Sequence, residues 1–180
     1  MKVVSERASL LVVDIQTRLV PAMHSGERVV ANAGILMASA RRLGIPLLVS
    51  EQYPRGLGPT VPELSKYLSE KETFEKVEFS CLGNAAYRRA FESLGRKQVV
   101  VTGIEAHVCV MQTVLDLLDA GYETAVVADA VSSRTPENHR HALDRMARAG
   151  AEIVTTEMVV FEWLGKAGTP EFKELSALIR

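Results

Sequence analysis

Residues 99–122, VVVTGIEAHVCVMQTVLDLLDAGY, join a strand, a turn and a helix in one short run. The apolar segment Val99–Thr102 favours a buried strand, and the apolar residues that follow Cys109 recur at helical spacing. Gly121 then offers a left-handed end to the helix. A strand that passes directly into a helix is the building unit of a parallel α/β sheet. The stretch therefore predicts an α/β fold and places Cys109 in the first turn of a helix.

The same alternation of apolar strands and amphipathic helices continues along the whole chain. Strands are expected at residues 10–13, 46–49, 74–77, 98–102, 124–128 and 152–155. Helices are expected at residues 27–43, 61–69, 85–94, 108–120 and 137–149. This pattern predicts a three-layer, doubly wound fold with a six-stranded, mainly parallel sheet in the order 3-2-1-4-5-6 and helices on both faces. Because no linker, repeat or low-complexity tract interrupts it, we expect residues 1–180 to form a single domain.

The charged residues almost balance, with 21 Lys and Arg against 22 Asp and Glu. A nucleic acid or an anionic membrane surface would select for a basic excess, so we expect neither as a partner. Cys81 and Cys109 lack the spacing of a metal site, and free thiols are typical of a reducing compartment. No apolar run has the length of a membrane span, and charged residues occur at 5–7, where a secretory signal would be apolar. The sequence therefore predicts a cytoplasmic protein, with an organellar matrix as the alternative.

Polar residues follow the first and fourth predicted strands, which are neighbours in the predicted sheet. Asp14 follows an apolar strand, where a carboxylate is costly to bury unless it is paired or functional, and Cys109 follows the fourth strand. Ligands of such sheets bind outside the carboxyl ends of the strands, so we expect the two side chains to face one crevice. Lys76, in the short third strand, would reach the same edge. The alternatives are a helix-capping or salt-bridged Asp14, and a Lys76 that is a solvated charge or protects the sheet edge from pairing.

Cys109 has two interpretations when its own segment is considered alone. The N–H groups and the dipole of a helix N-terminus stabilise a thiolate, which favours a nucleophile. The alternative is a small buried apolar residue, because free cysteine is among the most buried residue types.

Five segments, in this order, are similar to the isochorismatase-like cysteine hydrolase superfamily, and most closely to its isochorismatase-domain-containing group. They are LLVVDIQ (10–16), EQYPRGLGPTVPEL (51–64), EKVEFSC (75–81), GIEAHVCVMQT (103–113) and VVADAVSSR (126–134). The resemblance implies a catalytic triad of Asp14, Lys76 and Cys109. It also implies a cis peptide bond between Ile104 and Glu105, which would bring the Glu105 N–H beside the Cys109 N–H as a second oxyanion donor.

These residues lead to the hypothesis of a metal-independent cysteine hydrolase that cleaves a C–N, amide-like bond of a small molecule through a covalent Cys109 intermediate. Asp14 would accept the thiol proton, and Lys76 would stabilise the charges that form. A catalytically idle scaffold or interaction protein is the alternative, because a fold does not by itself establish a function. Relatives described as ribonucleases suggest a third possibility, which the balanced charge disfavours.

The resemblance also guides the expected pocket and assembly. We expect five residues to line the pocket: Gln16, Tyr53, Phe79, His107 and Gln112. No metal or other cofactor is expected, because residues 50–54, SEQYP, lack the Asp-x-His pair of metal-dependent nicotinamidases in the superfamily. Cys81 is interpreted as a passive thiol and Asp129 as a capping residue. The C-terminal stretch around Trp163 would either close the core or contact a partner subunit, and the resemblance favours a homo-oligomer, a dimer or larger.

Overall fold

Strand β1 (Ala8–Val13) forms the middle of the sheet because its apolar run can be buried on both faces. The computed structural model describes residues 1–179. All residues of β1 are buried, and their side chains alternate between two hydrophobic clusters. Leu10 and Val12 join the cluster on one face, and Leu11 and Val13 join the cluster on the other. The sheet is therefore covered on both sides.

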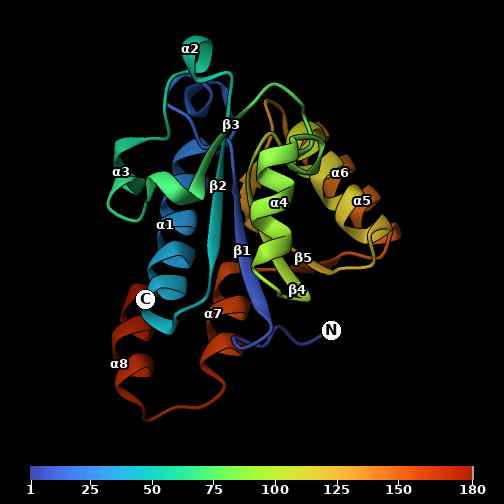
Figure 1. The fold of residues 1–180 in the computed structure, drawn as a ribbon. Helices are drawn as coiled ribbons and strands as arrows, with labels where there is room; N and C mark the ends of the chain where they lie inside the picture. Colours follow the sequence, from blue (N-terminus) through green and yellow to red (C-terminus); the bar gives the residue numbers. More distant parts are fainter. Residues whose placement is uncertain (180) are drawn as a thin grey trace.

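Five further strands pair in parallel around β1 (Figure 1). They are β2 (Leu47–Gln52), β3 (Thr73–Lys76), β4 (Gln98–Ile104), β5 (Glu123–Ser132) and β6 (Glu152–Val154). Their order across the sheet is β3-β2-β1-β4-β5-β6. The predicted strand order is therefore confirmed. The direction in which successive strands are added to the sheet reverses between β1 and β4, at the position where such sheets place their ligands.

Helices cover both faces of the sheet (Figure 1). On one face lie α1 (Gly26–Leu43), α3 (Pro62–Ser65), α7 (Thr156–Leu164) and α8 (Pro170–Ser176). On the other lie α4 (Ala85–Ser93), α5 (Met111–Asp119) and α6 (Pro136–Arg148). The short helix α2 (Pro54–Leu57) and the turns η1 (Val20–Ala22), η2 (Glu70–Glu72), η3 (Cys81–Gly83), η4 (Ala106–Val110) and η5 (Ala177–Ile179) complete the fold. None of the helices within residues 1–179 combines the length and the apolar character that crossing a membrane requires.

Two segments differ from the sequence-based prediction. The helix expected at 61–69 is only the single turn α3, because Leu64 alone is fully buried on α1 while the following residues turn toward β3. The helix α7 was not predicted. Its apolar residues lack a clear one-sided pattern, and Thr155 caps it by accepting a hydrogen bond from the Met158 N–H. Trp163 of α7 is buried in the cluster beside α1, so this tail closes the core.

A glycine allows β4 to pass close to β1 at the carboxyl end of the sheet. Gly103 has φ +126, and a Cβ atom there would lie 2.0 Å from the Val13 carbonyl oxygen. The pairing of β4 with β5 shifts register between Val101 and Gly103. Only glycine fits this position, and the backbone that follows it leads directly into the turn that carries Cys109.

Candidate active site

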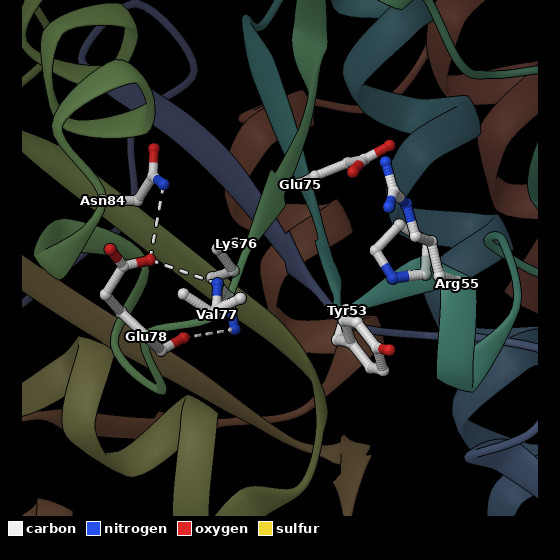
Figure 2. A pocket seen from close by; sticks show the side chains of 8 residues that line it. Tyr53, Arg55, Glu75, Lys76, Val77, Glu78 and Asn84 are labelled. Carbon is white, nitrogen blue, oxygen red and sulfur yellow. Dashed lines mark hydrogen bonds between the residues drawn. The ribbon is translucent and has the colours of Figure 1, made fainter.

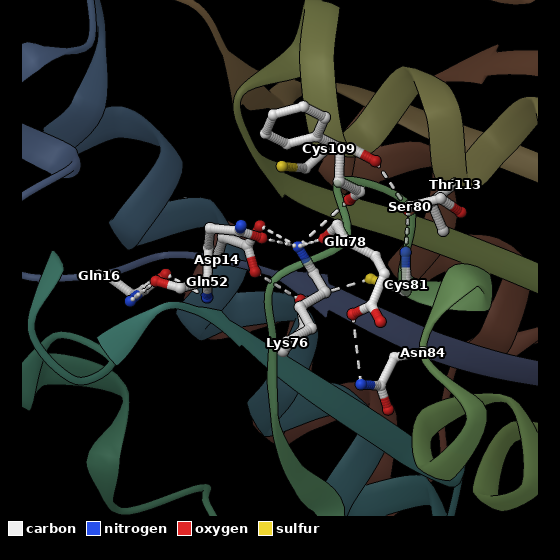
Figure 3. A network of polar contacts seen from close by, with 12 residues as sticks. Asp14, Gln16, Gln52, Lys76, Glu78, Ser80, Cys81, Asn84, Cys109 and Thr113 are labelled. Atoms are coloured by element: carbon white, nitrogen blue, oxygen red, sulfur yellow. Dashed lines mark hydrogen bonds and ion pairs between the residues drawn. The ribbon is translucent and has the colours of Figure 1, made fainter. Parts of the chain in front are cut away.

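The three residues of the expected triad lie at the same edge of the sheet (Figure 3). Asp14 directly follows β1, Lys76 is the last residue of β3, and Cys109 lies in the π-helical turn η4 after β4. Asp14 adopts φ 51, a left-handed conformation that is uncommon outside glycine but tolerated by aspartate. Its N–H donates to the Ser50 carbonyl at 3.1 Å. The sheet topology therefore collects side chains that are 62 and 95 residues from Asp14 in the sequence (76 minus 14 and 109 minus 14).

Lys76 and Asp14 form a fully buried ion pair. The distance from Lys76 Nζ to Asp14 Oδ2 is 2.7 Å, and both side chains have 0% exposure. Nζ also donates to Gln52 Oε1 at 2.7 Å and lies 3.2 Å from the carbonyl oxygens of Glu78 and Phe79. Acceptors therefore surround the ammonium, and Lys76 is not the solvated edge residue that its strand alone would suggest.

The electrostatics of the site favour a protonated thiol at rest. Burial lowers the pKa of Lys76, but the pKa is raised overall, and the negative charge of Asp14 is the largest cause that opposes burial. Burial also raises the pKa of Cys109, the charge of Asp14 raises it further, and Lys76 opposes both. The expectation that the helix start stabilises a thiolate is therefore wrong for the resting site. Removing the sulfur from water and placing it beside a carboxylate both disfavour the thiolate.

Gln16 ties the end of β2 to the loop that carries α2. Its Nε2 donates to the carbonyl oxygens of Gln52 and Gly58 at 3.0 and 2.7 Å, and its Oε1 accepts from the Gln52 N–H at 2.8 Å. Gln16 is 0% exposed. This tie differs from the pocket-lining role expected for Gln16, because all these contacts go to the main chain. Gln52 was not singled out from the sequence, although it both accepts from Lys76 and donates to the Val77 carbonyl at 2.9 Å.

Two polar contacts join the loops after β4 and β5. Glu105 accepts two hydrogen bonds from the Arg134 guanidinium, at 2.8 and 2.9 Å, and His107 Nδ1 lies 2.9 Å from Ser133 Oγ. The Glu105 carbonyl also accepts from the N–H groups of Val108 and Val110. The peptide bond between Ile104 and Glu105 is cis, as the resemblance implies. The segment before Cys109 is thus held by contacts to the loop after β5 and by hydrogen bonds within its own turn.

An open groove of about 380 Å³ lies along the end of β3 (Figure 2). Its lining includes Lys76 together with Tyr53, Arg55, Glu78 and Asn84. Of the other expected pocket residues, Phe79 is exposed beyond the end of β3, His107 is half-buried in η4, and Gln112 is exposed on α5. Tyr53 therefore shares a groove with Lys76.

Ser50 and Cys81 complete the surroundings of Asp14. Ser50 Oγ donates to Asp14 Oδ1 at 2.7 Å, and the Cys81 thiol donates to Ser50 Oγ at 3.4 Å. Neither residue was expected to contact the site. The parallel register pairs Val13 with Ser50, so the residue beside Asp14 could have been identified once β1 and β2 were paired. Asp129 caps the start of α7, where Oδ1 accepts from the N–H and the hydroxyl of Thr156 at 2.8 and 2.9 Å.

Within residues 1–179, no three His, Cys, Asp or Glu side chains gather in an arrangement that could hold a metal ion. The charged groups of the site are instead matched to one another, Asp14 with Lys76 and Glu105 with Arg134. What the arrangement offers chemically is a buried thiol, a carboxylate that can accept a proton and an ammonium that stabilises negative charge.

Comparison with known proteins places this arrangement in a family. A model of the isochorismatase domain matches residues 8–158, most of the chain. The chain belongs to the isochorismatase family. The family is a hydrolase family, and the six-stranded parallel sheet described above is its scaffold.

Relatives in the isochorismatase family differ in how they are described. Isochorismatase domain-containing protein 1 of Salmo salar is 41% identical over 93% of this chain, which spans 59% of that protein's length. The secreted isochorismatase effector Isc1 of Phytophthora sojae is 42% identical, with 84% of this chain and 74% of that protein covered. The MAR1 ribonuclease structure from Caenorhabditis elegans is 36% identical with a TM-score of 0.92, covering 99% and 92% of the two chains.

Proposed function

We propose that this chain is a metal-independent cysteine hydrolase that cleaves a C–N bond of a small amide-like molecule, with Cys109 as the nucleophile. The observation that carries the proposal is the fully buried Asp14–Lys76 pair at the same sheet edge as Cys109. A buried ion pair contributes little to stability by itself, and perturbed ionisable groups cluster at functional sites. The pair is therefore best explained by chemistry.

In the first half of the reaction, Asp14 takes the Cys109 proton as the sulfur attacks the carbonyl carbon. The resting thiol makes this general-base step necessary, because burial and Asp14 raise the pKa of Cys109. The C–N bond then breaks, the amine leaves with the proton held by Asp14, and an acyl thioester remains on Cys109. Lys76 stays protonated and stabilises the negative charge that forms near it.

In the second half, water attacks the thioester. Asp14 removes a proton from the water, the carbon–sulfur bond breaks, and the Cys109 thiolate regains its proton while the carboxylic acid departs. The N–H groups of Glu105 and Cys109 are the proposed donors to the oxyanion in both tetrahedral intermediates. The Glu105–Arg134 pair would hold the first of these donors in place.

The experiment is a screen of small primary amides with ammonia release as the readout, combined with intact-mass detection of the acyl-enzyme. We expect at least one amide to be turned over and to add its acyl mass to the wild type. Cys109→Ser should abolish the thioester, and Asp14→Asn should lower turnover by about 10²–10⁴-fold because it removes the general base.

Ser39→Ala is the matched control, because Ser39 is buried on α1, away from the sheet edge that carries the triad. It should turn over amides like the wild type. Activity that survives Cys109→Ser, or an acyl mass located on another residue, would contradict the proposal.

Ribonuclease activity is the second candidate, favoured by the name of the relative from Caenorhabditis elegans. The net charge of −1 gives no excess of cationic side chains for a phosphate backbone. Filter binding of RNA at two salt concentrations separates the candidates. We expect no salt-dependent retention, whereas binding that weakens steeply with salt would favour the ribonuclease.

The proposed setting is a reducing, cytoplasmic compartment and a homo-oligomer with a small-molecule substrate. Both cysteines are free, which fits reducing conditions, although one relative is a secreted effector. Met158, Phe161 and Leu178 are exposed apolar residues on the α7–α8 side and are candidates for a subunit contact. Light scattering of the purified chain tests the assembly, and a monomer at all concentrations would contradict it.

A further inference from the structure

Each oxygen of the Asp14 carboxylate has its own donor. Oδ2 accepts from Lys76 Nζ at 2.7 Å, and Oδ1 accepts from Ser50 Oγ at 2.7 Å. Asp14 and Ser50 are both 0% exposed, so water does not compete for either contact. Ser50 therefore fixes the rotation of a carboxylate that Lys76 alone would hold at one end only.

Cys81 gives the Ser50 hydroxyl its direction. The Cys81 thiol is 0% exposed, and burial, followed by the charge of Asp14, raises its pKa. The sulfur thus keeps its proton and donates it to Ser50 Oγ at 3.4 Å. A hydroxyl has a single proton, so a Ser50 that accepts from Cys81 is left to donate to Asp14.

The same residue also reaches the nucleophile through its main chain. The Cys81 N–H donates to Thr113 Oγ1 at 3.0 Å, and the Thr113 hydroxyl donates to the Cys109 carbonyl at 2.7 Å. A continuous buried path therefore runs from the Asp14 carboxylate through Ser50, Cys81 and Thr113 to the backbone of Cys109. Figure 3 labels Asp14, Cys81, Thr113 and Cys109 of this path.

We propose that Ser50 and Cys81 are positioning residues, which form a one-way donor chain, Cys81 thiol to Ser50 hydroxyl to Asp14 carboxylate, that orients the general base toward Cys109. This inference rests on the proposed function, since it assigns Asp14 the role of base. Cys81 is then a donor at the back of the site and not a passive thiol or a second nucleophile.

The charged and titratable groups around Asp14 come from several elements. Lys76 of β3 holds Oδ2, Cys109 of η4 and Cys81 of η3 lie beside it, and Tyr87 of α4 interacts with Cys81 and Asp14. The substitutions in the NMR experiment below leave Lys76, Cys109 and Tyr87 in place. A changed signal of the Asp14 carboxyl carbon can therefore be assigned to the donor chain.

The first test is Raman spectroscopy of the S–H stretch in a Cys109→Ala background, where Cys81 is the single thiol. A donated S–H vibrates at lower frequency than a free one, so Ser50→Ala should move the band upward. An unchanged band would overturn the chain. This readout needs no activity, so an inert Cys109 would overturn the proposed function and leave the result for Cys81 intact.

The second test is the chemical shift of the Asp14 carboxyl carbon in ¹³C NMR at neutral pH, with the resonance assigned by its loss in Asp14→Asn. This chemical shift depends on the hydrogen bonds that the carboxylate oxygens accept, so Ser50→Ala, which removes the donor to Oδ1, should move the resonance. Cys81→Ala should move it by less, and Cys81→Ser, which keeps a donor, should match the wild type.

Ser39→Ala supplies the control for loss of a buried hydroxyl. Among residues 1–179, Ser39 Oγ has no hydrogen-bond partner, so its removal should leave the Asp14 resonance unchanged. Identical chemical shifts in Ser50→Ala and the wild type would overturn the proposal. Should Ser50→Ala fail to fold, the two Cys81 variants decide, because equal chemical shifts in Cys81→Ala and Cys81→Ser would overturn it as well.

Discussion

Cys109 and Cys81 are both free, buried and close to Asp14, yet the proposed function assigns the role of nucleophile to Cys109 alone. Burial is the largest cause of the raised pKa of each thiol, and the charge of Asp14 is the next. Acidity therefore does not separate them. Access and hydrogen bonding do: Cys109 is 7% exposed in η4, whereas Cys81 is 0% exposed and donates to Ser50. In the proposed mechanism the two thiols are thus distinguished by exposure and by hydrogen bonding, and not by acidity.

The largest difference between the two thiols is expected in amide turnover when each sulfur is replaced by oxygen. Cys109→Ser should lower amide turnover by about 10⁴-fold or more, because a nucleophile cannot be replaced by its neighbours. Cys81→Ser keeps a donor for Ser50 and should lower turnover by less than about tenfold. Ammonia release measures both. Similar losses for the two variants would remove the distinction between the thiols.

Access should separate the two thiols almost as strongly. In the native protein iodoacetamide should modify Cys109, while Cys81 should react only when the chain unfolds, at least about 10³-fold faster in urea than in buffer. Peptide mass spectrometry reports each site separately. Equal native rates would show that the burial of Cys81 does not protect it.

Of these substitutions, the one that breaks the buried Asp14–Lys76 pair should lower stability most. Lys76→Met leaves the Asp14 carboxylate buried without its partner, and we expect a loss of about 3–5 kcal/mol in the free energy of unfolding. The double variant Asp14→Asn/Lys76→Met should recover much of that loss, because no buried charge is left. Urea unfolding measures both variants, and a single-variant cost below about 1 kcal/mol would contradict the buried pair.

The smallest effect is expected at the exposed end of the Glu105 contact. The Arg134 side chain is 65% exposed, so Arg134→Ala should lower Tm by no more than about 4 °C. Turnover should fall several-fold more in Arg134→Ala than in Arg134→Lys, because lysine keeps the positive charge although it loses the two-point contact. Equal turnover of Arg134→Ala and Arg134→Lys would show that the two-point contact of Arg134 does not position Glu105.

Most of the fold could be predicted from the sequence because its central strands are apolar on both faces. The runs around Leu10 and Val100 read clearly as buried parallel strands, and the glycines after the long helices mark their ends. The prediction for residues 61–69 was wrong in length, because apolar residues at helical spacing predict a helix whether or not they are buried. In the structure only Leu64 of that segment is fully buried, and one helical turn suffices for it.

The residues of the candidate site that lie at strand ends could be predicted from the sequence. A residue that reaches the site only through the pairing register of two strands could not. Asp14, Lys76 and Cys109 follow or end strands of the same sheet, so the topology brings them to one edge. Ser50 meets Asp14 only because β1 and β2 pair with Val13 opposite Ser50. The protonation of Cys109 was misjudged for a related reason, since burial and the charge of Asp14 raise its pKa, and neither can be read from its own segment of sequence.

The most direct test of the account is the rate of Cys109 alkylation by iodoacetamide against pH in the wild type, Asp14→Asn and Lys76→Met. Asp14 raises the pKa of Cys109 and Lys76 lowers it. At neutral pH Asp14→Asn should therefore react faster than the wild type and Lys76→Met more slowly, while the wild-type rate should keep rising through pH 9. Alkylation rates that neither substitution changes would contradict the claim that Asp14, Lys76 and Cys109 act as one site.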